Sequence, residues 1–182
     1  MFVKGEFNIE YNPTIEDSYS SEVTVDGKLI KMSIVDTAGQ EEYISLREQY
    51  YIKGDGFVMV YSIDNKNSFH ALKNHRDSIL GLRTGKKTAM VIAGNKCDLE
   101  EQRAISTEEI KKLSDEWAIP FFETSAQNNT NVKQLFETIA KELLKCNQTA
   151  ETAAPVAAAA AQPTAQAAAP PKKEKKGKCT LF

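Results

Sequence analysis

The sequence predicts an α/β fold, with a mostly parallel sheet and helices on both of its faces. Strand-like and helix-like segments alternate from residue 56 onward, and the strand-like runs are too continuously apolar for a sheet with one hydrated face. With 182 residues, of which 41% are hydrophobic, the chain is long enough for one domain with a sizeable core. In such a sheet, ligands bind beyond the carboxyl ends of the strands.

The strands are predicted from local patterns. Residues 21–35 indicate a hairpin, because Val23 and Val25 alternate with polar residues and Asp26-Gly27 supplies a turn before a second apolar run. Three short runs of apolar, β-branched or aromatic residues predict buried strands at 56–63, 88–94 and 119–126.

Two helices have clear sequence signals. Ser106 followed by Glu109 predicts a capping box for a helix that runs through Trp117. Residues 130–145 carry one apolar stripe at helical spacing. A further helix is expected between the strands at 56–63 and 88–94. His70 and His75 fall on it as ordinary helix residues.

The composition divides the chain into three parts. From residue 149 to 171 Ala, Pro, Gln and Thr dominate, and the prolines interrupt any helix there, so this segment is predicted to be a linker. Residues 172–182 then carry five Lys and one Glu, although the whole chain has a formal net charge of −2. We therefore expect a domain at 1–148, a linker at 149–171 and a basic tail at 172–182.

The tail has the pattern of a lipid anchor. Cys179 is followed by Thr, Leu and a terminal Phe, which fits prenylation, and the terminal Phe favours a geranylgeranyl group. The neighbouring Lys residues would add attraction to an anionic membrane leaflet. With no membrane-spanning run, signal peptide or disulfide framework in the sequence, we expect the cytoplasmic face of the cell membrane and no nucleic-acid partner. The alternative is a solvated Lys run with a chance cysteine.

Residues 81–88 superficially match a loop that binds phosphate. Such a loop has the spacing G-x-x-x-x-G-K-[ST] between a strand and a helix. Gly81 and Gly85 are one residue too close, an extra Lys precedes Thr88, and a strand is predicted to follow. We interpret the segment as a basic turn, and no other Gly-Lys pair in the sequence fits.

Two other loops carry residues suited to a nucleotide. In Asn95-Lys96-Cys97-Asp98 the Asp98 carboxylate can accept from both adjacent donors of guanine. In Asp36-Thr37-Ala38-Gly39-Gln40 the acidic residue can hold Mg²⁺ through water and the glutamine can orient an attacking water. The alternatives are a polar loop and a turn with a glycine. Because the loops at Asp36, Asn95 and Ser125 all follow predicted strands, they should converge.

These motifs together resemble the small GTPases of the Ras family, near Ras and Rap. The resemblance rests on "YNPTIEDSY" at 11–19, "DTAGQEEY" at 36–43, "NKCD" at 95–98, "ETSA" at 123–126 and the terminal "CTLF", in this order. It covers residues 2 to about 146 and the tail. It implies a Ras-like fold of the P-loop NTPase type, binding of GTP and GDP with Mg²⁺, hydrolysis of GTP, and effector proteins as partners.

The resemblance also implies roles for single residues. Gln40 would be catalytic, and Thr14 and Asp36 would hold Mg²⁺, Asp36 through water. The nucleotide would be bound by Phe7, Thr14, Asp36, Thr37, Ala38, Gly39, Gln40, Asn95, Lys96, Asp98, Ser125 and Ala126. The effector region would comprise Tyr11, Asn12, Pro13, Thr14, Ile15, Glu16, Asp17, Ser18 and Tyr19.

The sequence departs from the family pattern at its start. Met1 stands where the family's first helix should be ending, and the first strand and the phosphate loop are missing from the sequence. We expect impaired binding and hydrolysis of GTP, and either direct pairing of the strands on both sides of the missing one or a marginal domain. Three interpretations follow: a working switch whose N-terminus lies upstream, a non-catalytic membrane-tethered module that binds effectors, or an unstable truncated product.

Overall fold

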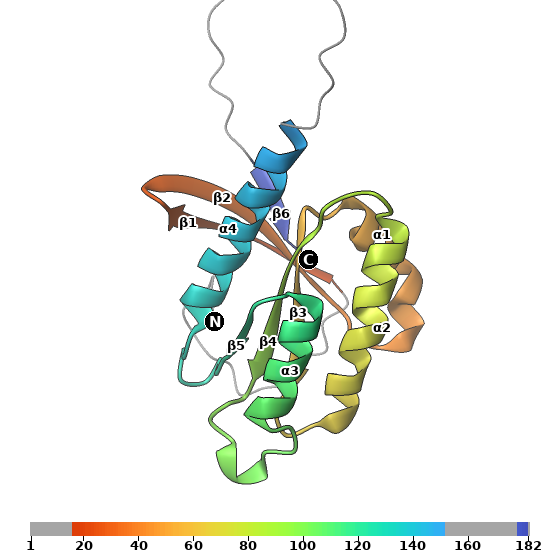
Figure 1. Cartoon of the computed structure of the whole chain (residues 1–182), viewed down its shortest axis with the longest axis vertical. Coiled ribbons are helices and arrows are strands. Elements are labelled where there is room, and N and C mark those ends of the chain that lie inside the picture. The colour runs from red at the N-terminus through yellow and green to blue at the C-terminus, as the bar shows by residue number, and fades with distance from the viewer. Residues whose placement is uncertain (1–15, 152–177, 182) are drawn as a thin grey trace, which may run out of the picture.

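The computed structural model describes residues 16–151 and 178–181, which form a six-stranded sheet in the order β1-β2-β6-β3-β4-β5 (Figure 1). The strands are β1 (Glu16–Val25), β2 (Lys28–Thr37), β3 (Gly56–Ser62), β4 (Ala89–Asn95), β5 (Phe121–Glu123) and β6 (Lys178–Leu181). The helices are α1 (Ile44–Lys53), α2 (Lys66–Leu82), α3 (Thr107–Trp117) and α4 (Val132–Glu151), with 3₁₀ turns η1 (Glu41–Tyr43) and η2 (Glu100–Gln102). The predicted α/β class is confirmed, because β2, β6, β3, β4 and β5 run parallel and only β1 is antiparallel.

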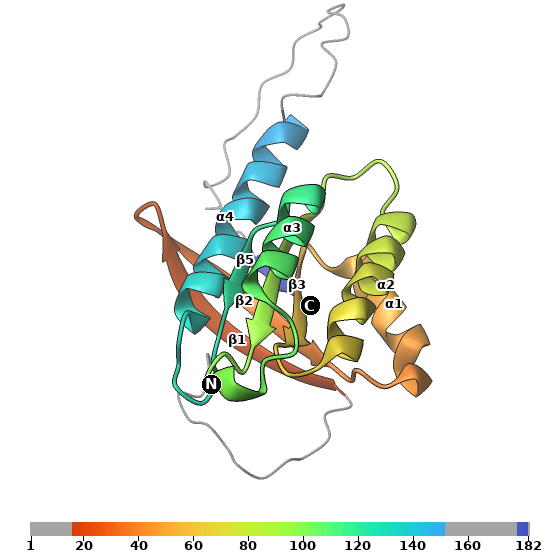
Figure 2. The ribbon, with the colours of Figure 1, turned by 60° about the horizontal axis from the view of Figure 1, so that its bottom comes forward.

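The hairpin forms where the sequence predicts it and is longer than predicted. Glu16 lies opposite Thr37 at one end and Val25 opposite Lys28 at the other. Asp26 and Gly27 both have positive φ, 50° and 76°, which is the backbone of a type I′ turn. The turn projects beyond the rest of the sheet in both views (Figures 1 and 2).

Each face of the sheet has its own core. On one face α4 packs against the hairpin and β4 (Figure 2). The buried cluster on this face includes Ile139 and Leu143 of α4 together with Val25, Met32 and Val91 of the sheet. On the other face α2 and α3 cover β3 and β4. Buried side chains there include Phe57, Met59, Ile79, Ile92 and Ile110.

The helix ends follow their sequence signals. The Ser106 side chain accepts from the Glu109 amide while the Glu109 carboxylate accepts from the Ser106 amide, so the predicted capping box is confirmed. Helix α2 begins at an Asn65 cap. Helix α4 runs to Glu151, past the predicted start of the linker at residue 149. Among the described residues, no helix has the length and apolar character needed to cross a membrane.

The middle of the sheet differs from the expected direct pairing of the strands on both sides of the missing one. Strands β2 and β3 do not pair directly, because β6 lies between them and pairs in parallel with both. Cys179 of β6 lies opposite Met32 of β2, and Leu181 lies opposite both Ile34 and Gly56. The residues predicted to be a lipid-modified tail therefore include a short strand inside the sheet.

Strand β5 is shorter than the predicted run at 119–126. Beyond Glu123 the backbone leaves the ladder, and Ser125 pairs with Thr130 in an isolated antiparallel bridge. Residues 124–126, which the sequence predicts as strand, instead form a loop at the carboxyl end of β5.

Candidate functional site

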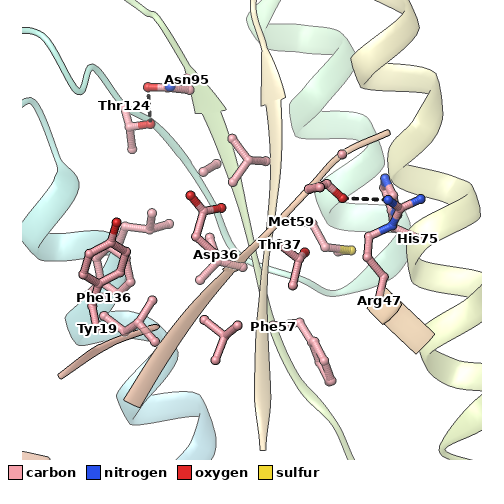
Figure 3. Close-up of a pocket in the computed structure, with 18 of the residues that line it drawn as sticks. Tyr19, Asp36, Thr37, Arg47, Phe57, Met59, His75, Asn95, Thr124 and Phe136 are labelled. Atoms are coloured by element: carbon pink, nitrogen blue, oxygen red, sulfur yellow. Dashed lines mark hydrogen bonds between the residues drawn. The ribbon is translucent and has the colours of Figure 1, made fainter. Parts of the chain in front are cut away.

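A cavity of about 620 Å³ lies between β2 and β3 and reaches the carboxyl ends of the strands (Figure 3). Asp36, Asn95, Thr124 and Ala126 line it at that end; Asp36 and Asn95 lie at the carboxyl ends of β2 and β4, and Thr124 and Ala126 lie in the loop after β5. The predicted convergence of these three loops is thus confirmed. Figure 3 shows Tyr19 and Phe136 on one side of the cavity and Arg47 and His75 on the other.

The loops after β4 and β5 are joined by hydrogen bonds. Ser125 is fully buried, and its Oγ donates to Asp98 Oδ1 at 2.5 Å and accepts from the Asn128 amide at 3.0 Å. The Cys97 amide donates to the Thr124 carbonyl at 3.0 Å. Asp98 is therefore held in one orientation before any ligand binds, which favours a role in recognition.

Lys96 turns the β4 loop sharply. Its φ of 62° lies in the left-handed region, and its carbonyl accepts from the Leu99 amide at 2.9 Å. The Lys96 ammonium lies 3.5 Å from Asp64 Oδ2, while Asn95 Oδ1 accepts a long bond of 3.4 Å from the Thr124 hydroxyl. Asn95 and Lys96 thus border the same region as Asp98.

Asp64 is a site neighbour that lies outside the sequence motifs described above. It follows β3, and a hydrogen bond from the Ser62 hydroxyl, together with Lys96, lowers the pKa of Asp64. An acidic residue just after a buried strand is the signal that marked Asp36, and the same rule would have marked Asp64.

Arg47 of α1 fixes the loop after β2. This buried side chain donates from one terminal nitrogen to the Ala38 carbonyl at 2.6 Å and to the Gln40 carbonyl at 2.5 Å. The Gln40 side chain itself is exposed. The motif at 36–40 gives no hint of Arg47, because the contact joins the loop to a separate helix.

The Asp36 residue is exposed, but its surroundings still disfavour the negatively charged form of its carboxyl group. Enclosure by neighbouring atoms raises the pKa of Asp36, and the negative charge of Asp17 raises it further. A bound cation would offset both effects. One carboxylate with water is a donor set that suits Mg²⁺, which keeps most of its waters, and the described residues contain no cluster of three or more His, Cys, Asp or Glu for a metal.

Not every predicted site residue reaches the cavity. Lys96, Asp98, Ser125 and Gln40 lie in the converging loops but do not line it. Of the predicted effector region, residues 16–19 begin the outermost strand β1, with Glu16, Asp17 and Ser18 exposed. Phe7 and residues 11–15, including Thr14, lie outside the described residues.

His75 predicts a pH dependence of stability. The Tyr51 hydroxyl lies 2.9 Å from His75 Nδ1, and burial, with Arg47 nearby, lowers the pKa of His75 below its ordinary 6.5. The unfolded chain therefore binds the proton at His75 more readily than the folded chain does. The contribution of neutral His75 to stability is complete above about pH 6.5 and is lost as the pH falls through the folded-state pKa. His75→Gln should flatten the change in melting temperature between about pH 7.5 and 5.5.

The matched control is His70→Gln, on the exposed face of the same helix. It should leave the pH profile of the melting temperature close to that of the parent. An unchanged profile in His75→Gln would contradict the assignment.

The parallel sheet, its flanking helices and the converging loops define an α/β protein of the P-loop NTPase type. Residues 1–145 match the Ras family. The match spans most of the 182 residues, so the chain belongs to the Ras family. It is by descent a small GTPase, from a family of nucleotide-binding signalling proteins.

Proposed function

We propose that the chain acts as a Ras-type switch that binds GTP and GDP together with Mg²⁺. The observation that carries the proposal is the Asp98 carboxylate, oriented by buried Ser125 beside the cavity into which Asp36 and Asn95 project. An ionised carboxylate only accepts hydrogen bonds, so at this place it selects a base edge with two donors, as guanine has.

The carboxyl end of β2 and the loop after it supply the other half of the proposed site. Asp36 would hold Mg²⁺ through water, and the metal would stabilise charge on the phosphates. Arg47 holds the Ala38 and Gln40 carbonyls, and the Gln40 side chain, which is exposed, would orient the attacking water. Thr14 would complete the metal site from outside the described residues.

Binding of Mg²⁺-GTP to the purified full chain, with Mg²⁺-ATP as the control, tests the proposed switch. We expect the chain to bind GTP more tightly than ATP, because adenine offers no pair of adjacent donors to Asp98. A chain that melts cooperatively but binds neither nucleotide at millimolar concentration would contradict it.

A second candidate function is effector binding without catalysis. It is favoured by the exposed start of β1, where Glu16, Asp17 and Ser18 lie on a strand that pairs on one side only among the described residues. An outer strand can accept a further strand from a partner. A folded chain that binds effector but no nucleotide would establish this alternative.

We further propose a lipid anchor on Cys179. Its thiolate would displace diphosphate from carbon 1 of geranylgeranyl diphosphate, which forms a thioether and releases the thiol proton to solvent. The Lys residues of 172–178 would add attraction to an anionic leaflet. The lipid and the Lys residues together give a stable anchor, whereas one lipid chain alone binds the membrane reversibly.

Cys179→Ser tests the anchor in cells. We expect the variant to move from the membrane pellet to the supernatant, because the sequence holds no other cysteine in this C-terminal pattern. Cys146→Ser is the matched control and should pellet like the parent. Pelleting of Cys179→Ser at the parent level would contradict the anchor.

A further inference from the structure

The seam between β2 and β3, bounded by residues 31–37 and 56–60, is wide enough for one more strand. β6 occupies part of it, pairing with β2 over residues 31–34 but with β3 only at Gly56. Beyond Leu181 the seam continues as the cavity of about 620 Å³, lined by Ile34 and Val35 on one side and by Val58 and Val60 on the other. The seam is thus longer than the strand that lies in it.

An extended chain is the ligand that this seam fits. Backbone N–H and C=O groups on two facing strand edges need partners, and a parallel strand between them supplies partners to both. The walls add apolar contacts from Leu135 and Phe136 of α4 on one face and Ile79 of α2 on the other. Strand addition of this kind is a common mode of peptide recognition.

We propose that the seam is a reversible groove for the chain's own residues 178–181, and that seating of this segment excludes lipid attachment at Cys179. The second half of this proposal rests on the lipid anchor proposed above. The register places residue 179 opposite Met32, whose side chain is 2% exposed. A backbone paired inside the sheet is not available to the active site of a transferase or to a bilayer surface.

Pairing of residues 178–181 in the seam is favourable, but it is also weak, and the two properties have separate reasons. The segment belongs to the same chain as the seam, so its pairing there is intramolecular and does not have the entropic cost of bringing two molecules together. The segment is only four residues long and meets β3 at one position, so its ordering entropy offsets much of the pairing. The seated and released states are therefore close in free energy, and an anionic bilayer that attracts the Lys-rich tail favours release.

Hydrogen exchange tests the seating in the unmodified full chain. We expect the amides of residues 179–181 to exchange at least about tenfold more slowly than in a free peptide of residues 172–182, because a paired amide exchanges only after local opening. Equal exchange rates in chain and peptide would overturn the proposal.

A reversible disulfide tests the register. Ser33 and Thr180 are register partners, and neighbouring strands lie ~4.8 Å apart, within disulfide reach. In a Cys97→Ser, Cys146→Ser background, Ser33→Cys with Thr180→Cys should cross-link under mild oxidation. Leu29→Cys with Thr180→Cys is the matched control, since Leu29 is exposed on β2 outside the residues paired with β6, and should not cross-link.

The locked chain tests the exclusion. A purified transferase supplies geranylgeranyl, and mass spectrometry after digestion identifies lipid on Cys179. We expect transfer to the oxidised chain to be at least about tenfold slower than to the same chain with reductant, because the lock removes the released state. Equal rates of lipid transfer to the oxidised and reduced chains would overturn the exclusion. Equal cross-linking of the Ser33 and Leu29 pairs would overturn the register.

The two proposals fail in different ways. If the free peptide and the reduced chain both accept no lipid, the anchor is overturned and the exclusion with it. The exchange and cross-linking results still decide whether residues 178–181 bind in the seam.

Discussion

Asp98→Asn should abolish the preference for guanine nucleotides over others. The carboxylate can accept from both guanine donors, whereas an amide accepts one and opposes the other with its own N–H. Two charge-assisted bonds at ~1.5–3 kcal/mol each correspond to a loss of roughly 10²–10⁴ in affinity for GTP. Competition between GTP, ATP and xanthosine triphosphate measures the effect.

The variant should keep its fold and gain a new ligand. Asn retains an oxygen that can accept from the Ser125 hydroxyl, so the tie between the two loops survives. Its amide matches the donor and acceptor of xanthine, so we expect xanthosine triphosphate to bind better than GTP. Asp115→Asn, exposed on α3, is the matched control. GTP selectivity retained in Asp98→Asn would refute the assignment of Asp98.

Arg103→Leu should give the largest loss of stability among changes to polar side chains near the site. Arg103 forms two hydrogen bonds with the Glu123 carboxylate, at 2.7 and 2.9 Å, and a third with the Ile105 carbonyl. Its bonds to Glu100 and Glu123 raise the pKa of Arg103, so it stays charged. Removing it leaves a half-buried Glu123 without its cation, at a cost of ~2–3 kcal/mol, which a thermal melt would show as a fall of about 5–10 °C.

Two further variants separate this ion pair from a general loss of packing. The Glu100 side chain is 68% exposed against 24% for Glu123, so Glu100→Gln should lower the melting temperature much less than Arg103→Leu does. Adding Glu123→Leu to Arg103→Leu should restore part of the stability, because the uncompensated charge is then gone. A double variant as unstable as the sum of both single variants would contradict the explanation.

Much of the framework follows from local sequence. The Asp26-Gly27 turn and the alternation around it give the hairpin, and Ser106 with Glu109 gives the start of α3, because both signals act over a few residues. The position of loops after strands also predicts that Asp36 and Asn95 meet, since the carboxyl ends of parallel strands share one edge.

The remainder depends on contacts between distant parts of the chain. Arg47 contacts the loop at 36–40 only once α1 has packed, and no local pattern marks it. The strand at Lys178–Leu181 follows a linker rich in Ala and Pro and a run of Lys, and its alternation spans only four residues, too few to mark a strand. Its conformation comes from the space between β2 and β3, which exists only in the assembled sheet.

The place of β6 affects the order in which the domain can form. Among the described elements it is last in sequence and lies in the interior of the sheet, so its pairing with β2 joins residues far apart along the chain. Such contacts raise the contact order and slow folding. During synthesis β2 and β3 leave the ribosome well before β6, so their facing edges await their partner and are open to pairing with other chains. A nascent chain stalled before residue 178 should therefore depend on chaperones more than the released protein does.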